Sequence, residues 1–382
     1  MIGPNVILLM AGKTVSGNIL ITRRPQCNGR RCAKFRRSNV LMPNTQRQVV
    51  MAERPSGSLA MRHFRSEVVP VPQRPADAVL LRNIFVSVAP GARAVMQGAA
   101  YRRQLVPGEV IPSSVIAEVM AAPPGGPEPG SIVGGAGGWQ EYSVVPTSEI
   151  WPLERVGELS HHLGLLGRNG LTAYFGIREV AQLRAGETVV VSGAAGGVGH
   201  IAGQLARVVG ARVVGITSSA EKNEILRRQL GYTAAVDRRS PSFADDLRAA
   251  CPAGVDVYFD NVGGPVREVV LPLLARHGRI VCCGVTAHYD ADRPPVGMTD
   301  IAMQLIVKSL RMQGFLVADY LPRWGTAQRE LHALQRSGEL TVLEDIRDGL
   351  DSAPGALIEM LAGGNIGQLA VRLAPDPPGW RA

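Results

Sequence analysis

The stretch ETVVVSGAAGGVG, residues 187–199, decides the fold of this chain. An apolar, β-branched strand runs directly into a glycine-rich turn, and a helix over residues 198–209 follows. Gly196, Gly197 and Gly199 have no Cβ atom, so backbone and phosphate can approach closely. The N–H groups at the helix start, and the positive end of its dipole, then face an anion. This order of strand, turn and helix predicts a site for a dinucleotide pyrophosphate.

The residues after the second predicted strand indicate which dinucleotide binds. That strand, ARVVGIT, ends at Thr217 without the Asp or Glu that holds the ribose 2′-hydroxyl in NAD sites. Its neutral end is followed by Ser218 and, within one helical turn, by Lys222. Arg238, after the third strand, offers a second cation for a 2′-phosphate. The sequence therefore predicts NADPH, with a solvated helix-surface lysine as the alternative reading of Lys222.

The net charge of +9 is confined to one end of the chain. Residues 1–41 hold eight lysines and arginines and no acidic residue, which leaves +1 for the other residues. A nearly neutral body is unlike a nucleic-acid-binding protein, so we expect no nucleic-acid partner. We interpret the basic segment as a start assigned too early, with Met42 as the true first residue, as a disordered extension, or as a targeting sequence.

Two further features of the composition bear on the compartment. No stretch approaches the roughly 20 apolar residues of a membrane-spanning helix, so no membrane partner is expected. The five cysteines have neither the spacing of a disulfide framework nor that of a zinc site. We therefore predict a cytoplasmic protein without a bound metal.

The hydrophobic pattern divides the rest of the chain into two parts. Short strands broken by Pro and Gly fill residues 46–145, which predicts an antiparallel, barrel-like β domain. Strands and helices then alternate from residue 188 to residue 317, including one helix over 265–275, which predicts a doubly wound parallel sheet. We expect the helix at 327–337 and the strands after it to fold back on the β domain, and residues 375–382 to be loosely held.

Several segments of the chain resemble the zinc-independent medium-chain dehydrogenase/reductases, within them the leukotriene B4 dehydrogenase, prostaglandin reductase and curcumin reductase group. The segments span most of residues 46–373 and include YFDNVGG (258–264), GRIVCCGVTAHYDAD (278–292) and RMQGFLVADY (311–320). The resemblance implies a Rossmann domain at residues 168–322, and a GroES-like antiparallel β-barrel at residues 42–167 and 323–382. It also implies that NADPH adds hydride to the β-carbon of an α,β-unsaturated ketone or aldehyde without a metal.

The resemblance also assigns roles to individual residues. Tyr289 is the catalytic candidate, because its position matches a tyrosine near the nicotinamide ribose and the substrate. The cofactor-binding candidates, in chain order, are Ala195, Gly196, Gly197, Val198, Lys222, Arg238, Asn261, Cys283, Gly284, Val285, Thr286, Tyr289, Phe315, Leu316, Val317 and Asn365. The first four match the pyrophosphate loop, and Asn365 matches an asparagine that reaches back to the cofactor.

Three departures from the family pattern lie on the substrate side. Gly91 stands where the group has an active-site tyrosine, Ser113 and Ser114 replace a glycine-rich turn, and Arg168 and Asn169 replace Met-Pro. They keep two alternatives open: a zinc-free quinone reductase, and an NADPH-binding sensor with impaired catalysis. The expected partners are a small-molecule enone, alkenal or quinone and a second copy of the chain in a homodimer.

Overall fold

The structure is a computed structural model that describes residues 42–97, 103–289 and 301–380. The basic extension predicted at residues 1–41 lies outside the described residues. Residues 43–382 form one compact unit. Within its described part, no helix is both long enough and apolar enough to cross a membrane.

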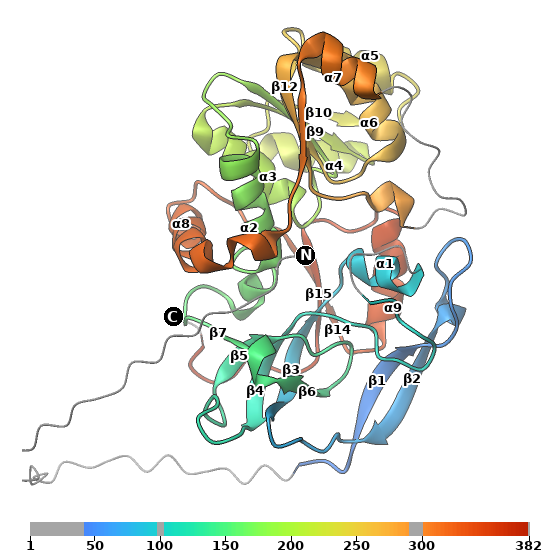
Figure 1. Cartoon of the computed structure of the whole chain (residues 1–382), viewed down its shortest axis with the longest axis vertical. Coiled ribbons are helices and arrows are strands. Elements are labelled where there is room, and N and C mark those ends of the chain that lie inside the picture. Colours follow the sequence, from blue (N-terminus) through green and yellow to red (C-terminus); the bar gives the residue numbers. More distant parts are fainter. Residues whose placement is uncertain (1–41, 98–102, 290–300, 381–382) are drawn as a thin grey trace, which may run out of the picture. The chain divides into compact units, whose positions relative to one another are not determined.

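A parallel sheet of six strands lies at the centre of the nucleotide-binding half (Figure 1). In spatial order its strands are β10 (Ala234–Asp237), β9 (Arg212–Thr217), β8 (Thr188–Ser192), β11 (Val255–Asp260), β12 (Leu274–Cys282) and β13 (Arg311–Gly314). From β8 the chain adds strands first toward one edge of the sheet, up to β10, and then toward the other edge, from β11 to β13. Ligands of doubly wound sheets bind at the switch point between these two halves, here between β8 and β11. The predicted doubly wound fold is confirmed.

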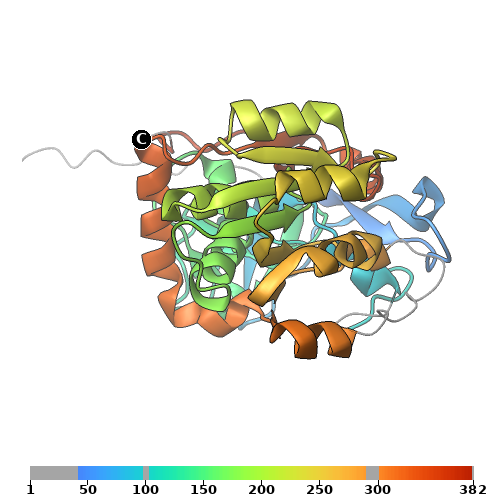
Figure 2. The same cartoon turned by 90° about the horizontal axis from the view of Figure 1, so that it is seen from above.

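Alternating side chains of β8 show which helices cover each face of this sheet. Val189 and Val191 pack with residues of the helices on one face, and Val190 packs with those on the other. The first face carries α2 (Arg168–Phe175), α3 (Gly199–Val209), α4 (Ala220–Arg228) and α8 (Trp324–Arg336); the second carries α5 (Phe243–Ala250) and α6 (Gly264–Val270). Figure 2 shows the sheet between these helices, with α7 (Ile301–Lys308) beside β12.

The other half is a mainly antiparallel sheet built from both ends of the chain. Its strands are, in order, β14 (Glu344–Asp348), β15 (Gln368–Arg372), β3 (Ala78–Ser87), β4 (Val115–Ala121), β5 (Ile132–Gly135) and β7 (Trp151–Pro152), with β6 (Tyr142–Pro146) also paired to β3. The strands β1 (Thr45–Met51) and β2 (Phe64–Pro70) form a separate hairpin-like pair. Valines of these strands pack with α1 (Gly91–Gln97) and α9 (Ser352–Leu361) in one apolar core.

The C-terminal segment follows the expectation only in part. β15 pairs with β3 in antiparallel fashion, so the last strand does fold back on the N-terminal sheet. The expectation is wrong for α8, because its apolar residues Ala327 and Leu331 are buried among residues of the nucleotide half. Trp380 also contradicts the expected loose end: it is 3% exposed, and its ring meets that of His162 edge-on at 5.5 Å.

The helix predicted over residues 265–275 is shorter in the structure. α6 ends at Val270, a 3₁₀ turn covers Leu271–Leu273, and β12 begins at Leu274. Pro272 has no N–H group and its ring clashes with a preceding helical carbonyl, so it cannot lie inside a continuing α-helix. After this break β12 pairs with β11 in parallel register. The carboxyl end of β12 leads into residues that line the cavity described below.

Candidate functional site

A cavity of about 540 Å³ lies between the carboxyl ends of β8 and β11 and the helix α1. The residues predicted for the site that line this cavity are Ala195, Gly196, Gly197, Val198, Lys222, Arg238, Asn261, Cys283, Gly284, Thr286, Tyr289, Val317 and Asn365. The structure therefore gathers around one space residues that lie up to 170 positions apart in the sequence.

The glycine loop is shaped by contacts with its own chain as much as by the need to admit a ligand. A Cβ atom at Gly199 would lie 2.3 Å from the carbonyl oxygen of Gly193. Gly193 itself has a φ of +59°, a conformation that favours glycine. A Cβ atom at Gly197 would lie 2.4 Å from Nδ2 of Asn169. The turn therefore depends on glycine at position 199, where the obstacle is backbone, whereas at position 197 the obstacle is the end of a side chain.

A buried histidine fixes the glycine loop from below. His200 donates a hydrogen bond from Nδ1 to the carbonyl oxygen of Gly196 at 2.8 Å, and its Nε2 accepts one from the N–H group of Leu343 at 3.3 Å. Burial lowers the pKa of His200 to about 4, so the ring is neutral at ordinary pH. Only the neutral ring can donate at one nitrogen and accept at the other.

The C-terminal segment 363–368 runs across the open side of the glycine loop. The N–H group of Gly367 donates to the carbonyl oxygen of Ala195 at 2.7 Å. Nζ of Lys222 donates to the carbonyl oxygens of Gly363 and Asn365, at 2.7 and 2.6 Å. Lys222 is only 8% exposed, so it is a tethering residue of this segment and not a solvated surface lysine.

Cations crowd the end of the cavity beyond β9. Ser218 is 7% exposed and contacts the Gly363 carbonyl oxygen at 3.2 Å, and Arg238 lines the same end. Burial, and then repulsion from Arg239, lower the pKa values of both Lys222 and Arg238. Among the described residues, neither of the two forms an ion pair with a carboxylate. A phosphate dianion fits this corner, because it would relieve the mutual repulsion of the cations.

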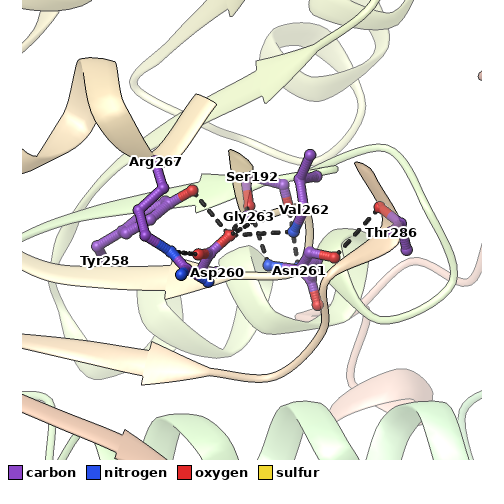
Figure 3. A network of polar contacts seen from close by, with 8 residues as sticks. All are labelled: Ser192, Tyr258, Asp260, Asn261, Val262, Gly263, Arg267 and Thr286. Carbon is purple, nitrogen blue, oxygen red and sulfur yellow. Dashed lines mark hydrogen bonds and ion pairs between the residues drawn. The ribbon is translucent and has the colours of Figure 1, made fainter. Parts of the chain in front are cut away.

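Behind the end of β11 the carboxylate of Asp260 organises a buried polar network (Figure 3). Its Oδ1 accepts hydrogen bonds from the side chains of Ser192 and Tyr258, at 3.1 and 2.8 Å, and from the N–H groups of Val262 and Gly263, at 3.0 and 2.8 Å. Oδ2 accepts from Nε of Arg267 at 2.5 Å. Burial would lower the pKa of Arg267, but the Asp260 carboxylate outweighs it and raises that pKa.

Asn261 is held by the same network at the cavity wall. Its N–H group donates to Oγ of Ser192 at 2.9 Å, and its Nδ2 donates to the Ser192 carbonyl oxygen at 2.7 Å. Both bonds orient the asparagine, so its side-chain oxygen remains for the cavity. Asn261 thus lies just beyond the end of β11, at the switch point of the sheet.

The opposite end of the cavity is lined mainly by apolar side chains, together with Ser113 and Ser114. Its lining includes Val88, Ala92, Val95, Pro112 and Trp151. Gly91 lines it too, and an added Cβ there would meet no described atom within 4 Å. A side chain at position 91 would therefore meet no obstacle at its Cβ atom.

Comparisons with known proteins agree with this geometry. Residues 47–153 match a family described as the N-terminal domain of oxidoreductase, and residues 197–334 match the zinc-binding dehydrogenase family. The NADPH-dependent curcumin reductase of Escherichia coli (strain K12) is 35% identical over 336 residues, which are 86% of this chain and 97% of that protein. The NADP(+)-dependent 2-alkenal reductase of Nicotiana tabacum is 34% identical over 311 residues, 80% of this chain and 90% of that protein.

A solved structure matches over the same length. CurA of Vibrio vulnificus, in complex with NADPH, has a TM-score of 0.81 and 33% identity, covering 86% of this chain and 100% of that chain. The chain belongs to the zinc-independent medium-chain dehydrogenase/reductases. The predicted membership in their curcumin and alkenal reductase group is thereby confirmed.

Three candidates of this dehydrogenase/reductase do not line the cavity. Val285 packs toward the backbone at Gly263, whose added Cβ would lie 3.4 Å from it. The ring of Phe315 packs against Tyr320, with centroids 6.3 Å apart, and Leu316 is 46% exposed. The resemblance assigns Val285 to a loop under the nicotinamide, and Phe315 and Leu316 to a segment that contacts the cofactor through its backbone, so their role in cofactor binding stays a prediction.

Several residues of the dehydrogenase/reductase site were missed by sequence reasoning. Asn169 donates a hydrogen bond to Oε1 of Gln368, which joins α2 to β15 beside the glycine loop. Asp260 and Arg267 support the loop that follows β12. An aspartate inside the apolar run VYFD was a usable signal, since a buried carboxylate requires a partner. Over residues 42–97, 103–289 and 301–380, no three His, Cys, Asp or Glu side chains come together in a metal-binding arrangement.

Proposed function

We propose that this protein is an NADPH-dependent reductase of the C=C bond in α,β-unsaturated ketones and aldehydes. The observation that carries the proposal is a single cavity with a phosphate-binding end and an apolar end. The glycine loop and the start of α3 suit a pyrophosphate, and Ser218, Lys222 and Arg238 suit a 2′-phosphate. Relatives named as curcumin and 2-alkenal reductases support the same chemistry.

When bound, NADPH supplies the hydride that is added to the β-carbon of the substrate. The chain's own residues bind and orient. The apolar wall around Val88, Gly91 and Trp151 holds the hydrophobic body of the enone and excludes water from it. Tyr289, in the loop that follows β12, also lines the cavity. Its hydroxyl group is the proposed hydrogen-bond donor to the carbonyl oxygen, where negative charge develops as the enolate forms.

Turnover of a substrate panel tests the proposal. NADPH oxidation is followed with alkenals, aryl enones and quinones, and the products are identified. The expected product is the saturated aldehyde or ketone with its carbonyl group intact. Quinol as the sole product would support the quinone reductase instead, and tight NADPH binding without turnover of any of them would support the impaired sensor.

We further propose that the protein is a homodimer. β13 is the outermost strand of the parallel sheet, and an edge strand can pair with its copy across a two-fold axis. Beside it α7 exposes apolar side chains: Ile306 is 72% exposed and Val307 is 61% exposed. Light scattering should give a dimer for the wild type and a monomer for Ile306→Lys. Val68→Lys on β2, a residue 71% exposed, is the matched control that should stay dimeric.

The cytoplasmic location also remains our proposal. It rests on cysteine usage, since Cys251, Cys282 and Cys283 are all free thiols in the structure. Burial raises the pKa values of Cys251 and Cys283, to about 11 and about 12, so these thiols are poor nucleophiles at neutral pH.

A further inference from the structure

The loop 283–289 lines the end of the cavity that we propose for the nicotinamide. Hydrogen bonds to three backbone carbonyl oxygens at the end of β11 hold this loop in place. The N–H groups of Cys283 and Gly284 donate to the carbonyl oxygen of Asp260, at 2.9 and 3.0 Å. The N–H group and Oγ1 of Thr286 both lie 3.3 Å from the carbonyl oxygen of Asn261. The N–H group of Ala287 donates to the carbonyl oxygen of Val262 at 3.0 Å. Three consecutive residues, the last of β11 and the two that follow it, therefore carry the loop.

The conformation of those three residues is set by one carboxylate. Oδ1 of Asp260 binds the N–H groups of Val262 and Gly263, which turns the chain back on itself directly after the strand. Gly263 accordingly has a φ of +69°. The loop packs closely on this turn, since a Cβ atom at Gly284 would lie 2.9 Å from the carbonyl oxygen of Asn261. A shift of the turn must therefore shift the loop.

Arg267 holds the carboxylate in its place. Asp260 is 0% exposed and Arg267 is 6% exposed, and Nε lies 2.5 Å from Oδ2. Neither residue lines the cavity, whereas their neighbours Asn261, Val262 and Val266 do. A buried ion pair is weak support for stability alone, because the desolvation of two charges offsets much of their attraction. The geometry of the pair is therefore better explained by what it positions.

A second ion pair in the same sheet provides the comparison. Arg279 of β12 contacts Glu187, next to the start of β8, at 2.5 Å, with both side chains mostly buried. It lies at the amino end of the strands, away from the cavity, whereas Asp260 and Arg267 lie at the carboxyl end. The two pairs thus differ chiefly in whether a cavity loop depends on them.

We propose that Asp260 and Arg267 are positioning residues, which hold the loop 283–289 so that Thr286 and Tyr289 face the reacting end of the cavity. They set the rate of reduction without touching cofactor or substrate. The expected effect on the rate rests on the proposed reductase activity. The expected effect on the conformation of the loop does not. Cofactor affinity should depend on them less than kcat does, because the proposed phosphate-binding residues Ser218, Lys222 and Arg238 lie at the other end of the cavity.

Arg267→Gln tests this role, with Arg279→Gln as the matched control. Hydrogen exchange of the amides in 283–289, measured without cofactor, should become about 10-fold faster in Arg267→Gln and stay unchanged in Arg279→Gln. With NADPH and an enone, kcat should fall roughly 10-fold or more in Arg267→Gln, while the Kd of NADPH changes less than about 3-fold. Arg267→Lys, which restores a cation to Asp260, should recover part of the lost kcat.

Equal exchange and equal kcat in the two glutamine variants would overturn the proposal. If Arg267→Gln does not fold, Ser192→Ala keeps it testable, since Oγ of Ser192 connects Asp260 to the N–H group of Asn261. Faster exchange of the loop in Ser192→Ala supports the proposal, and unchanged exchange contradicts it. If the wild type reduces no enone, the proposed function fails, but the exchange comparison in the cofactor-free protein still decides the positioning role.

Discussion

At the carboxyl end of β8 the cavity wall is backbone fixed by hydrogen bonds, whereas beside α1 it consists of side chains from several segments of the chain. The first end leaves no room for a Cβ atom at Gly199, and its lysine is tied to two carbonyl oxygens. The second end leaves open space at Gly91. A rigid backbone wall can bind the cofactor, which is the same in every reaction. A substrate that varies requires a wall of side chains, because side chains are changed by single substitutions. We therefore expect substrate selectivity to be set at the α1 end.

The largest effect is expected from breaking the rigid end. Gly199→Ala places a Cβ atom 2.3 Å from the Gly193 carbonyl oxygen, so the glycine loop must move. We expect NADPH affinity, measured by fluorescence titration, to fall about 100-fold, because displacement of a binding group by about 1 Å costs that much. Gly355→Ala in α9, where an added Cβ meets no described atom within 4 Å, should bind NADPH normally. Normal binding by Gly199→Ala would contradict the rigidity of this end.

A smaller change is expected when one cation of the rigid end is removed. Lys222→Ala should weaken NADPH binding about 10- to 100-fold, the worth of a charge-assisted hydrogen bond to a phosphate. NADH lacks the 2′-phosphate, so its affinity should fall much less. Because Lys222 also tethers residues 363–365, Arg238→Ala serves as a control that leaves this tether in place. An unchanged ratio of NADPH to NADH affinity in both variants would refute the 2′-phosphate site.

At the α1 end of the cavity we expect a substitution to change substrate selectivity without loss of the fold. Gly91→Tyr should fill the open space and lower kcat/KM for a bulky aryl enone about 10-fold, within the range that a hydrophobic pocket can discriminate. Turnover of a small alkenal and the affinity for NADPH should stay within about 2-fold of the wild type. If the bulky and the small substrate lose equally, the space at Gly91 does not belong to the substrate site.

The smallest expected effect is a loss of folding stability at acidic pH, through buried histidines at the cavity. His200 under the glycine loop and His162 in the cavity wall both have pKa values lowered to about 4 by burial. Unfolding raises them toward about 6.5, so the unfolded chain takes up protons between pH 6.5 and 4 and stability falls as the pH falls through this window. Each histidine should cost about 1 kcal/mol between pH 6.5 and 5.5. Urea unfolding of His200→Asn should show a loss smaller by that amount, and an equally steep loss would contradict the assignment.

Sequence reasoning succeeded where the residues that matter are close in the chain. β8 and β9 lie at the predicted residues, because apolar runs between turn-forming residues leave few alternatives. The glycine loop is equally local. The position of α8 was wrong because its apolar stripe fits either half, and only the tertiary contacts with Leu171 and Phe175 choose between them. The tether from Lys222 to Asn365 depends on residues that are more than 140 positions apart, which no periodicity reveals.

The pairing of β15 with β3 has a consequence for how the chain is made. A ribosome synthesises β3 early and β15 among the last residues, so residues 85–87 of β3 must wait without their β15 partner on one edge of the strand. All strands of the parallel sheet have left the ribosome before β15 is made. We therefore expect the nucleotide half to fold during synthesis and the N-terminal half only after release. An unpaired strand edge is prone to aggregation, so this interval is when the nascent protein most needs a chaperone.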